Sequence, residues 1–176
     1  MSMIGEYARL TPAELQRAIS DPEWVMDYLD ELKDALDEAE VHEDEWDGSD
    51  DPPGRAKLYS TYKTWNLLAY LLDRASFPVN VIYGERVLNS EQDWGYGAAS
   101  YLTPDRVKYA ANALDATPYS QLAQGVTPAD LNGAGIYPIP WEAEDSAEWG
   151  REHYERLTAF FGAAADAGDA VLCWLD

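Results

Sequence analysis

The sequence predicts a helix-rich mixed α/β domain, and three observations lead to this fold class. Helix-start signals recur along the chain, apolar residues return at three- and four-residue spacing over several segments, and the run 170–175 is apolar and β-prone. The chain has 176 residues, of which 47% are hydrophobic. A chain of this size buries one core without disulfides or metals, so we expect a single domain over residues 1–176.

Four Thr-Pro pairs mark expected helix starts, because a threonine hydroxyl can cap a helix and proline fits its first turn. They lie at Thr11-Pro12, Thr103-Pro104, Thr117-Pro118 and Thr127-Pro128. Glu14 and Asp130 stand three residues after the first and the last of these threonines, which is the spacing of a capping box. Asp21-Pro22 repeats the signal with an aspartate as the cap.

The helix expected after Asp21 is amphipathic. Its inner stripe is formed by Val25, Tyr28, Leu29, Leu32 and Leu36. Its outer face carries a ladder of acids, namely Asp27, Asp30, Glu31, Asp34, Asp37 and Glu38. Like charges at i, i+4 on a helix each cost about 0.2 to 0.5 kcal/mol. Two explanations stay open for the ladder: a docking surface for a basic partner, or a solubilising surface of an acidic protein.

The net charge of the chain is −21, and much of it is local. Residues 27–51 contain thirteen acids and one lysine, a net charge of −12. The stretch at about 41–57 combines acids with turn formers, so we expect an exposed acidic loop within the domain. This charge argues against binding to nucleic acid or to a membrane surface, because both require a footprint of lysine and arginine.

Apolar spacing predicts three further helices. The central one is indicated by Leu58, Tyr62, Trp65, Ala69 and Leu72. Residues 104–115 form the second and residues 144–167 the third, which ends at Gly168. The inward side chains of the third are expected to be Trp149, Leu157, Phe160, Phe161 and Ala164. Within residues 79–88, apolar residues alternate as they do in a strand.

Five short segments provide anchors that span nearly the whole chain. They are MIGEYARLTP at residues 3–12, KTW at 63–65, DWGYGAASYLTP at 93–104, IYP at 136–138 and GDAVL at 168–172. In these segments the sequence resembles the YfbM-like family, a group of bacterial proteins without an assigned activity. The resemblance implies an α/β fold, a helix-rich single domain with a small mixed sheet covered by helices. It also implies a helix, in place of a strand, at residues 79–88.

The chain departs from the family pattern at two places. The pattern acid, apolar, acid, lysine, variable residue, tryptophan would begin where this chain has Ser60, Thr61 and Tyr62, so both acids are missing. Where the family often has proline and, two residues later, arginine, this chain has Ala98 and Ser100. A general acid–base site on that segment would have lost its titratable pair, which weakens an enzymatic interpretation.

Seven residues are candidates for lining a ligand pocket: Lys63, Trp65, Trp94, Gly95, Tyr96, Gly97 and Tyr137. Glycines on both sides of Tyr96 would let the backbone approach a ligand closely. The alternative is a tight turn in which both glycines take positive φ angles while Trp94, Tyr96 and Tyr101 pack on the core. In the same way Trp65 is either a pocket wall or a core residue, with the Lys63 stem extending to solvent. We expect Trp94 or Tyr96 to lie close to the central helix.

The sequence predicts no catalytic residue, cofactor or metal site. His42 and His153 are not spaced as metal ligands are. Cys173 is expected to be a buried, reduced thiol. The first residues lack the charged start and apolar stretch of a secretory signal, and no apolar run approaches the roughly 20 residues that cross a bilayer. We therefore expect a cytoplasmic protein.

These observations favour a non-enzymatic acidic binding protein that recognises a basic protein partner, as immunity and antitoxin-like inhibitors do. The alternative is a small-molecule-binding or hydrolytic protein with a pocket near the Gly-Tyr-Gly loop. The two interpretations differ in geometry. The pocket requires Lys63, Trp65 and Tyr137 to converge with the Gly-Tyr-Gly segment at residues 95–97, the glycine loop. The binding surface requires only an exposed acidic face.

Overall fold

The structure is a computed structural model of the whole chain, and it describes residues 2–41 and 57–176. The acidic loop expected at about 41–57 lies outside the described residues, apart from its two end residues. None of the described helices is long and apolar enough to cross a bilayer.

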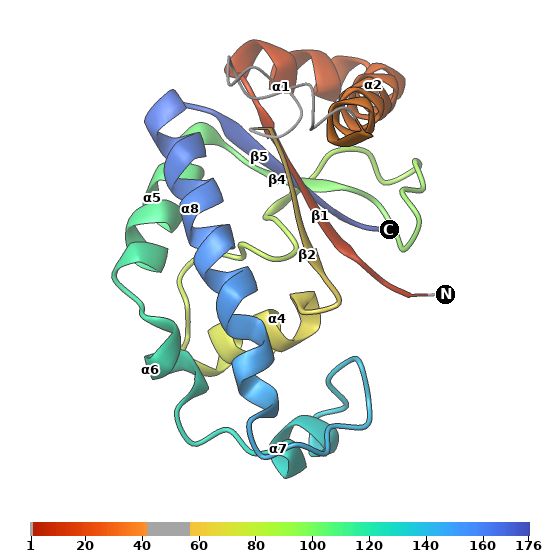
Figure 1. Cartoon of the computed structure of the whole chain (residues 1–176). Helices are drawn as coiled ribbons and strands as arrows, with labels where there is room; N and C mark the ends of the chain where they lie inside the picture. Colours follow the sequence, from red (N-terminus) through yellow and green to blue (C-terminus); the bar gives the residue numbers. More distant parts are fainter. Residues whose placement is uncertain (1, 42–56) are drawn as a thin grey trace.

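A five-stranded sheet forms the centre of the domain (Figure 1). Its strands are β1 (Gly5–Leu10), β2 (Leu58–Tyr62), β3 (Arg86–Val87), β4 (Ser100–Leu102) and β5 (Ala170–Leu175), in the spatial order β2-β1-β5-β4-β3. The first and last strands pair from Gly5 with Leu175 to Leu10 with Ala170, so the two ends of the chain meet in the middle. The predicted α/β class and closing strand are confirmed.

Every strand pairing in the described residues is antiparallel, so the expectation of a mixed sheet is wrong in this respect. The reason lies in the connections. The chain leaves β1 at one end of the sheet, forms two helices there, and re-enters β2 at the same end (Figure 1). A parallel neighbour would instead need a crossover that carries the chain to the opposite end of the sheet.

Both faces of the sheet are covered by helices. On one face, Tyr7 and Cys173 point toward α4 (Trp65–Arg74), α5 (Pro104–Asp115), α6 (Tyr119–Ala123), α7 (Pro128–Gly133) and α8 (Arg151–Ala167). On the other face, Ala8 and Trp174 point toward α1 (Pro12–Ser20) and α2 (Pro22–Val41). Because successive side chains of a strand alternate between faces, one sheet separates two hydrophobic clusters. Figure 1 shows α1 and α2 set apart from the remaining helices.

Most of the predicted helix starts are confirmed by local hydrogen bonds. Thr11 and Glu14 form a capping box at α1, and Thr127 and Asp130 form another at α7. The Asp21 carboxylate accepts the Trp24 N–H at 3.2 Å at the start of α2. Thr103 stands at the N-cap of α5 without a side-chain cap bond, and α6 begins two residues after Thr117. The Thr117 hydroxyl does not cap α6 because it donates to the Ala113 carbonyl of α5 at 2.7 Å.

The predicted central helix is shorter than expected. Residues 58–62 form β2, which pairs with β1, and α4 begins only at Trp65. The break occurs at Tyr62, whose φ of 48° lies in the left-handed region, and at Thr64, whose hydroxyl donates to the Thr61 carbonyl at 2.6 Å. Pairing with a distant strand has therefore overridden a local helical spacing. Trp65, Leu68 and Leu72 are buried on α4, as predicted.

Two other segments differ from the prediction. Residues 79–88 form mostly turns that bury Val79, Val81 and Ile82, and only the short β3 is a strand. The third predicted helix begins as the 3-10 helix η2 (Ser146–Gly150) before α8, and Trp149 lies 42% exposed against Trp141 instead of inward. The end of α8 is as predicted, because Gly168 takes a φ of 74°.

Candidate functional site

The acidic face of α2 is exposed along the helix. Val25, Leu29 and Leu32 are buried against the sheet, as the amphipathic pattern predicts. The outer face presents the six predicted carboxylates, all of them exposed: Asp27, Asp30, Glu31, Asp34, Asp37 and Glu38. None of the six forms an ion pair with another residue in the part of the chain that the structure describes. Within residues 2–41 and 57–176, the face is therefore a stripe of charge without paired counterions.

A cleft of about 220 Å³ lies beside this face, between α2, the glycine loop and the end of β5. Its apolar part is formed by Met26, Leu29, Trp94 and Trp174, and its polar part by Asp30, Lys33, Asp93 and Asp176, with Gly95 between them. The Trp94 and Trp174 rings pack at 5.5 Å between centroids. The Lys33 ammonium lies 5.5 Å from the centre of the Trp174 ring. The cleft thus combines aromatic surface with three carboxylates.

The glycine loop forms a tight turn against the end of β5. The φ angles of Gly95 and Gly97 are 117° and 114°, and the Trp94 N–H donates to the Gly97 carbonyl at 3.0 Å. The Tyr96 N–H donates to the Leu175 carbonyl at 3.1 Å, and a Cβ atom on Gly95 would lie 3.1 Å from the same oxygen. Trp94 is buried, whereas the Tyr96 side chain is 42% exposed and does not pack on the core. The structure therefore agrees with the tight-turn alternative, except that the Tyr96 side chain does not pack on the core.

The other pocket candidates lie on the opposite face of the sheet. The Trp65 ring stacks on Tyr137 at 6.0 Å and meets the edge of Tyr83 at 6.0 Å. The Trp65 indole N–H donates to the Met3 carbonyl at 3.1 Å, which fixes the ring as a core residue. Lys63 is exposed. Trp65 belongs to the same cluster as Tyr7.

The seven pocket candidates therefore do not converge. Trp94 belongs to the cluster on the α2 face, whereas Trp65 and Tyr137 pack on the α4 face. Trp94 therefore packs with the α2 cluster and not with the cluster of the central helix α4. The physical reason is the alternation of side chains along β1 and β5, which sends neighbouring residues to opposite faces.

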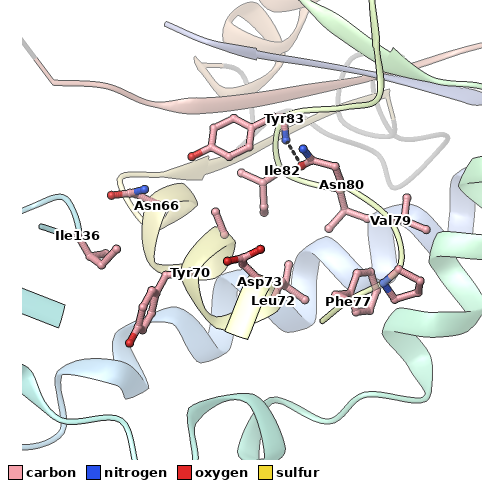
Figure 2. Close-up of a pocket in the computed structure, with 13 residues that line it drawn as sticks. Asn66, Tyr70, Leu72, Asp73, Phe77, Val79, Asn80, Ile82, Tyr83 and Ile136 are labelled. Carbon is pink, nitrogen blue, oxygen red and sulfur yellow. Dashed lines mark hydrogen bonds between the residues drawn. The ribbon is translucent and has the colours of Figure 1, made fainter. Parts of the chain in front are cut away.

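A larger cavity, of about 390 Å³, lies between α4 and residues 77–83 (Figure 2). Ile136 closes one side of it. Sequence reasoning missed its lining because Asp73 and Asn80 look like ordinary polar residues at a helix end and in a turn. The alternating residues Val79, Val81 and Tyr83 were the sequence signal that could have indicated the lining, but their spacing suggests a strand, whereas they lie in a turn that folds back over α4.

Two further side chains that could carry chemistry, Cys173 and His153, are buried or partly buried. The Cys173 thiol is free and buried in β5, as predicted, and burial raises its pKa, so the thiol is protonated at neutral pH. His153 is half-buried beside Tyr62, its Nδ1 atom has no hydrogen-bond partner, and burial lowers its pKa. No group of three or more His, Cys, Asp or Glu side chains suited to a metal ion occurs within residues 2–41 and 57–176.

Comparison with known proteins places the chain in a family. No curated protein matches its sequence significantly. Among solved structures, one similar in fold is the crystal structure of a protein of unknown function, YfbM from Escherichia coli, with a TM-score of 0.66. The two share 14% sequence identity, and the similarity covers 98% of this chain and 99% of that one. The model of a domain of unknown function, DUF1877, matches residues 1–174, and the chain therefore belongs to this family.

Proposed function

We propose that this protein is a non-enzymatic acidic binding protein that recognises a basic protein partner, in the manner of an immunity or antitoxin-like inhibitor. One observation carries the proposal. The exposed stripe of carboxylates on α2 adjoins a cleft with an aromatic floor, and Asp30 belongs to both. Charge and apolar anchoring surface therefore lie side by side on one face of the molecule.

This combination matches the anatomy of protein interfaces. A buried centre of aromatic and apolar side chains supplies most of the binding energy, and a charged rim steers the encounter. Trp94, Trp174 and Met26 would serve as the centre, and the α2 carboxylates as the rim. An arginine or lysine of the partner suits the cleft, because its stem can pack on Met26 while its charge lies near Asp93 and Asp176.

Lys33 indicates that the cleft accepts a cation. Its ammonium already lies over the Trp174 ring, among the carboxylates that line the cleft. A partner's basic side chain would have to displace it or share the site. Replacing Lys33 with glutamine should therefore strengthen association with a basic partner, whereas a surface that acts only as a solubilising face would show no such effect.

The proposal is tested by neutralising the acidic stripe without changing its shape. The test variant carries Asp30→Asn, Asp34→Asn and Glu38→Gln. The matched control carries Glu142→Gln, Glu144→Gln and Asp166→Asn, which remove the same charge from exposed residues outside α2. Each tagged protein is used to capture partners from a lysate of the native host, and the captured proteins are identified by mass spectrometry.

We expect a basic protein that is captured by the wild type and by the control but lost from the α2 variant. Its association rate, measured by stopped flow, should fall with added salt for the wild type and should be slower and less salt-dependent for the α2 variant. Equal capture by all three proteins, or an association rate indifferent to salt, would overturn the proposal.

A second candidate function rests on the same cleft. The Trp94 indole N–H is buried and has no hydrogen-bond partner among the described residues. An unpaired buried donor is unusual, and a small ligand with an acceptor group would satisfy it. This small-molecule-binding or hydrolytic alternative predicts that Trp94→Phe abolishes ligand binding, whereas the triple substitution on α2 has little effect.

A further inference from the structure

The cavity beside α4 has an apolar floor and a polar rim. The floor is formed by buried side chains, namely Leu72, Val79, Val81, Ile82 and Ile136. The rim carries the exposed residues Asp73, Asn80 and Tyr83. Its volume of about 390 Å³ lies in the range of small-molecule pockets, about 300 to 1,000 Å³. This shape suits a small ligand with an apolar body and one polar end.

The charge at the rim is a single carboxylate. Asp73 is the one acidic or basic side chain among the described residues that line the cavity. Figure 2 shows its carboxylate in the middle of the lining side chains, between α4 and Ile82. Asp73 makes no ion pair with any described residue. The cavity therefore offers an unmatched negative charge at its mouth.

Neither Arg74 nor Arg106 forms an ion pair with Asp73. Arg74 donates to the carbonyls of Leu122 and Gln124, at 3.2 and 3.1 Å. Arg106 donates two hydrogen bonds to the Glu85 carboxylate, at 2.9 and 2.7 Å, so its charge is already matched. Among the described residues, no side chain forms an ion pair with Asp73, so a cationic ligand could supply the matching charge.

Aromatic side chains surround the same space. Tyr70, Phe77 and Tyr83 line the cavity, and aromatic faces attract cations through their quadrupole. Tyr83 is fixed, because its N–H donates to the Asn80 side-chain oxygen at 3.0 Å and its ring packs on Trp65. The backbone of Phe77 is held by its N–H, which donates to the Leu72 carbonyl at 3.0 Å. These walls are in place before binding, which lowers the ordering cost of binding.

Other ligand classes fit less well. An anion would be repelled by Asp73 and by the net charge of −21. A bare metal ion would need several ligand side chains, and the described lining residues include no second carboxylate, histidine or cysteine beside Asp73. A neutral apolar molecule would fill the floor but leave the carboxylate unused.

We propose that this cavity is a binding site for a small organic cation, an amine whose ammonium group contacts Asp73 and whose apolar body lies on the floor of the cavity. The site is separate from the acidic face of α2, because the sheet lies between the α4 cluster and the α2 cluster. The amine site and the proposed protein partner can therefore be tested independently, and failure of one proposal would not refute the other.

The test uses three probes that share one aromatic body and differ in charge: 2-phenylethylamine, 2-phenylethanol and 3-phenylpropionate. Each is titrated to millimolar concentration into the isotope-labelled protein, and backbone amide shifts are followed by NMR. We expect the amine to give saturable shifts in the last turn of α4 and in residues 77–83. The alcohol should bind there at least about tenfold more weakly, and the carboxylate should not bind.

Two variants separate a specific ion pair from general attraction to an acidic protein. Asp73→Asn removes the charge while keeping the side-chain shape, and Asp166→Asn removes one charge from an exposed position on α8. We expect Asp73→Asn to weaken amine binding about tenfold while leaving alcohol binding unchanged, which also shows that the cavity is intact. Asp166→Asn should bind the amine like the wild type.

Four outcomes would overturn the assignment. They are equal affinity for amine and alcohol, equal amine binding by the two variants, shifts that gather on α2 instead of α4, and no saturable shift with the amine.

Discussion

Neutralising the acidic stripe of α2 should stabilise the isolated protein. The substitutions Asp30→Asn, Asp34→Asn and Glu38→Gln remove every like-charge pair that these residues make at i, i+3 and i, i+4. On α2 these are Asp27 with Asp30, Asp30 with Asp34, Glu31 with Asp34, Asp34 with Asp37, and Asp34 with Glu38. At about 0.2 to 0.5 kcal/mol each, the five pairs amount to roughly 1 to 2.5 kcal/mol at low salt. The attraction between Asp30 and Lys33 at i, i+3, which Asp30→Asn also removes, subtracts about 0.2 to 0.5 kcal/mol from this gain.

The gain is measurable by thermal unfolding. For a domain of this size, 1 kcal/mol shifts the melting temperature by about 2 to 4 °C, so we expect a rise of several degrees at low ionic strength. At physiological salt, screening over about 8 Å weakens repulsion between exposed carboxylates, so the difference should shrink. The wild type should gain more stability from salt than the variant does.

The control variant at Glu142, Glu144 and Asp166 changes the net charge equally but removes no such pair from a helix. A rise in melting temperature equal to that of the α2 variant would show that net charge, and not the ladder, sets the repulsion. No rise in either variant would refute the calculation. Stability and partner association should respond to the α2 substitutions with opposite signs, because the ladder opposes folding and assists encounter.

Three further predictions concern single residues. Gly95→Ala should destabilise the protein more than Gly97→Ala. Both glycines have positive φ angles, which cost an alanine about 1 to 3 kcal/mol, but only at Gly95 would the added Cβ crowd the Leu175 carbonyl. Equal urea midpoints for the two variants would contradict this prediction. Ser76→Gly should stabilise the end of α4 by about 1 kcal/mol, because Ser76 has a left-handed φ of 54°, and a lower urea midpoint would contradict it. Burial acts to raise the pKa of Glu14, but hydrogen bonds from Tyr28, Lys57 and Thr11 outweigh it and hold the pKa below its ordinary value of 4.5. The stability that Glu14 contributes is therefore present above pH 4.5 and lost as the pH falls through its folded pKa, so Glu14→Gln should flatten this acid-side decline in urea titrations at several pH values.

The parts of the fold that the sequence predicts well are those set by neighbouring residues. The capping box of Thr11 and Glu14 involves residues three apart, and Gly168 ends α8 by its own backbone freedom. The buried stripe and acidic face of α2 also follow from spacing along a single helix. In each case the chemistry that decides the structure lies within one or two turns of the chain.

The parts that it predicts poorly depend on distant residues. Leu58 and Tyr62 are spaced as in a helix, but they belong to β2 because β1 pairs with them. The cleft needs Trp174 on the same face as Trp94, and only the register of β5 against β1 decides which face Trp174 occupies. The acidic stripe could be found from the sequence, whereas the aromatic floor beside it could not.

The two proposed sites lie on opposite faces of the sheet, so we expect binding at one site to have little effect on the other. An amine at Asp73 changes the net charge of −21 by one unit, and the charge lies across the sheet from α2. Screening over about 8 Å leaves little of that change at the acidic stripe. Any coupling would then have to pass through packing, and coupling between two binding sites is reciprocal. A saturating amine should therefore leave the partner's association rate and affinity unchanged, and a measured change in either would show that the sheet transmits binding on one face to the other.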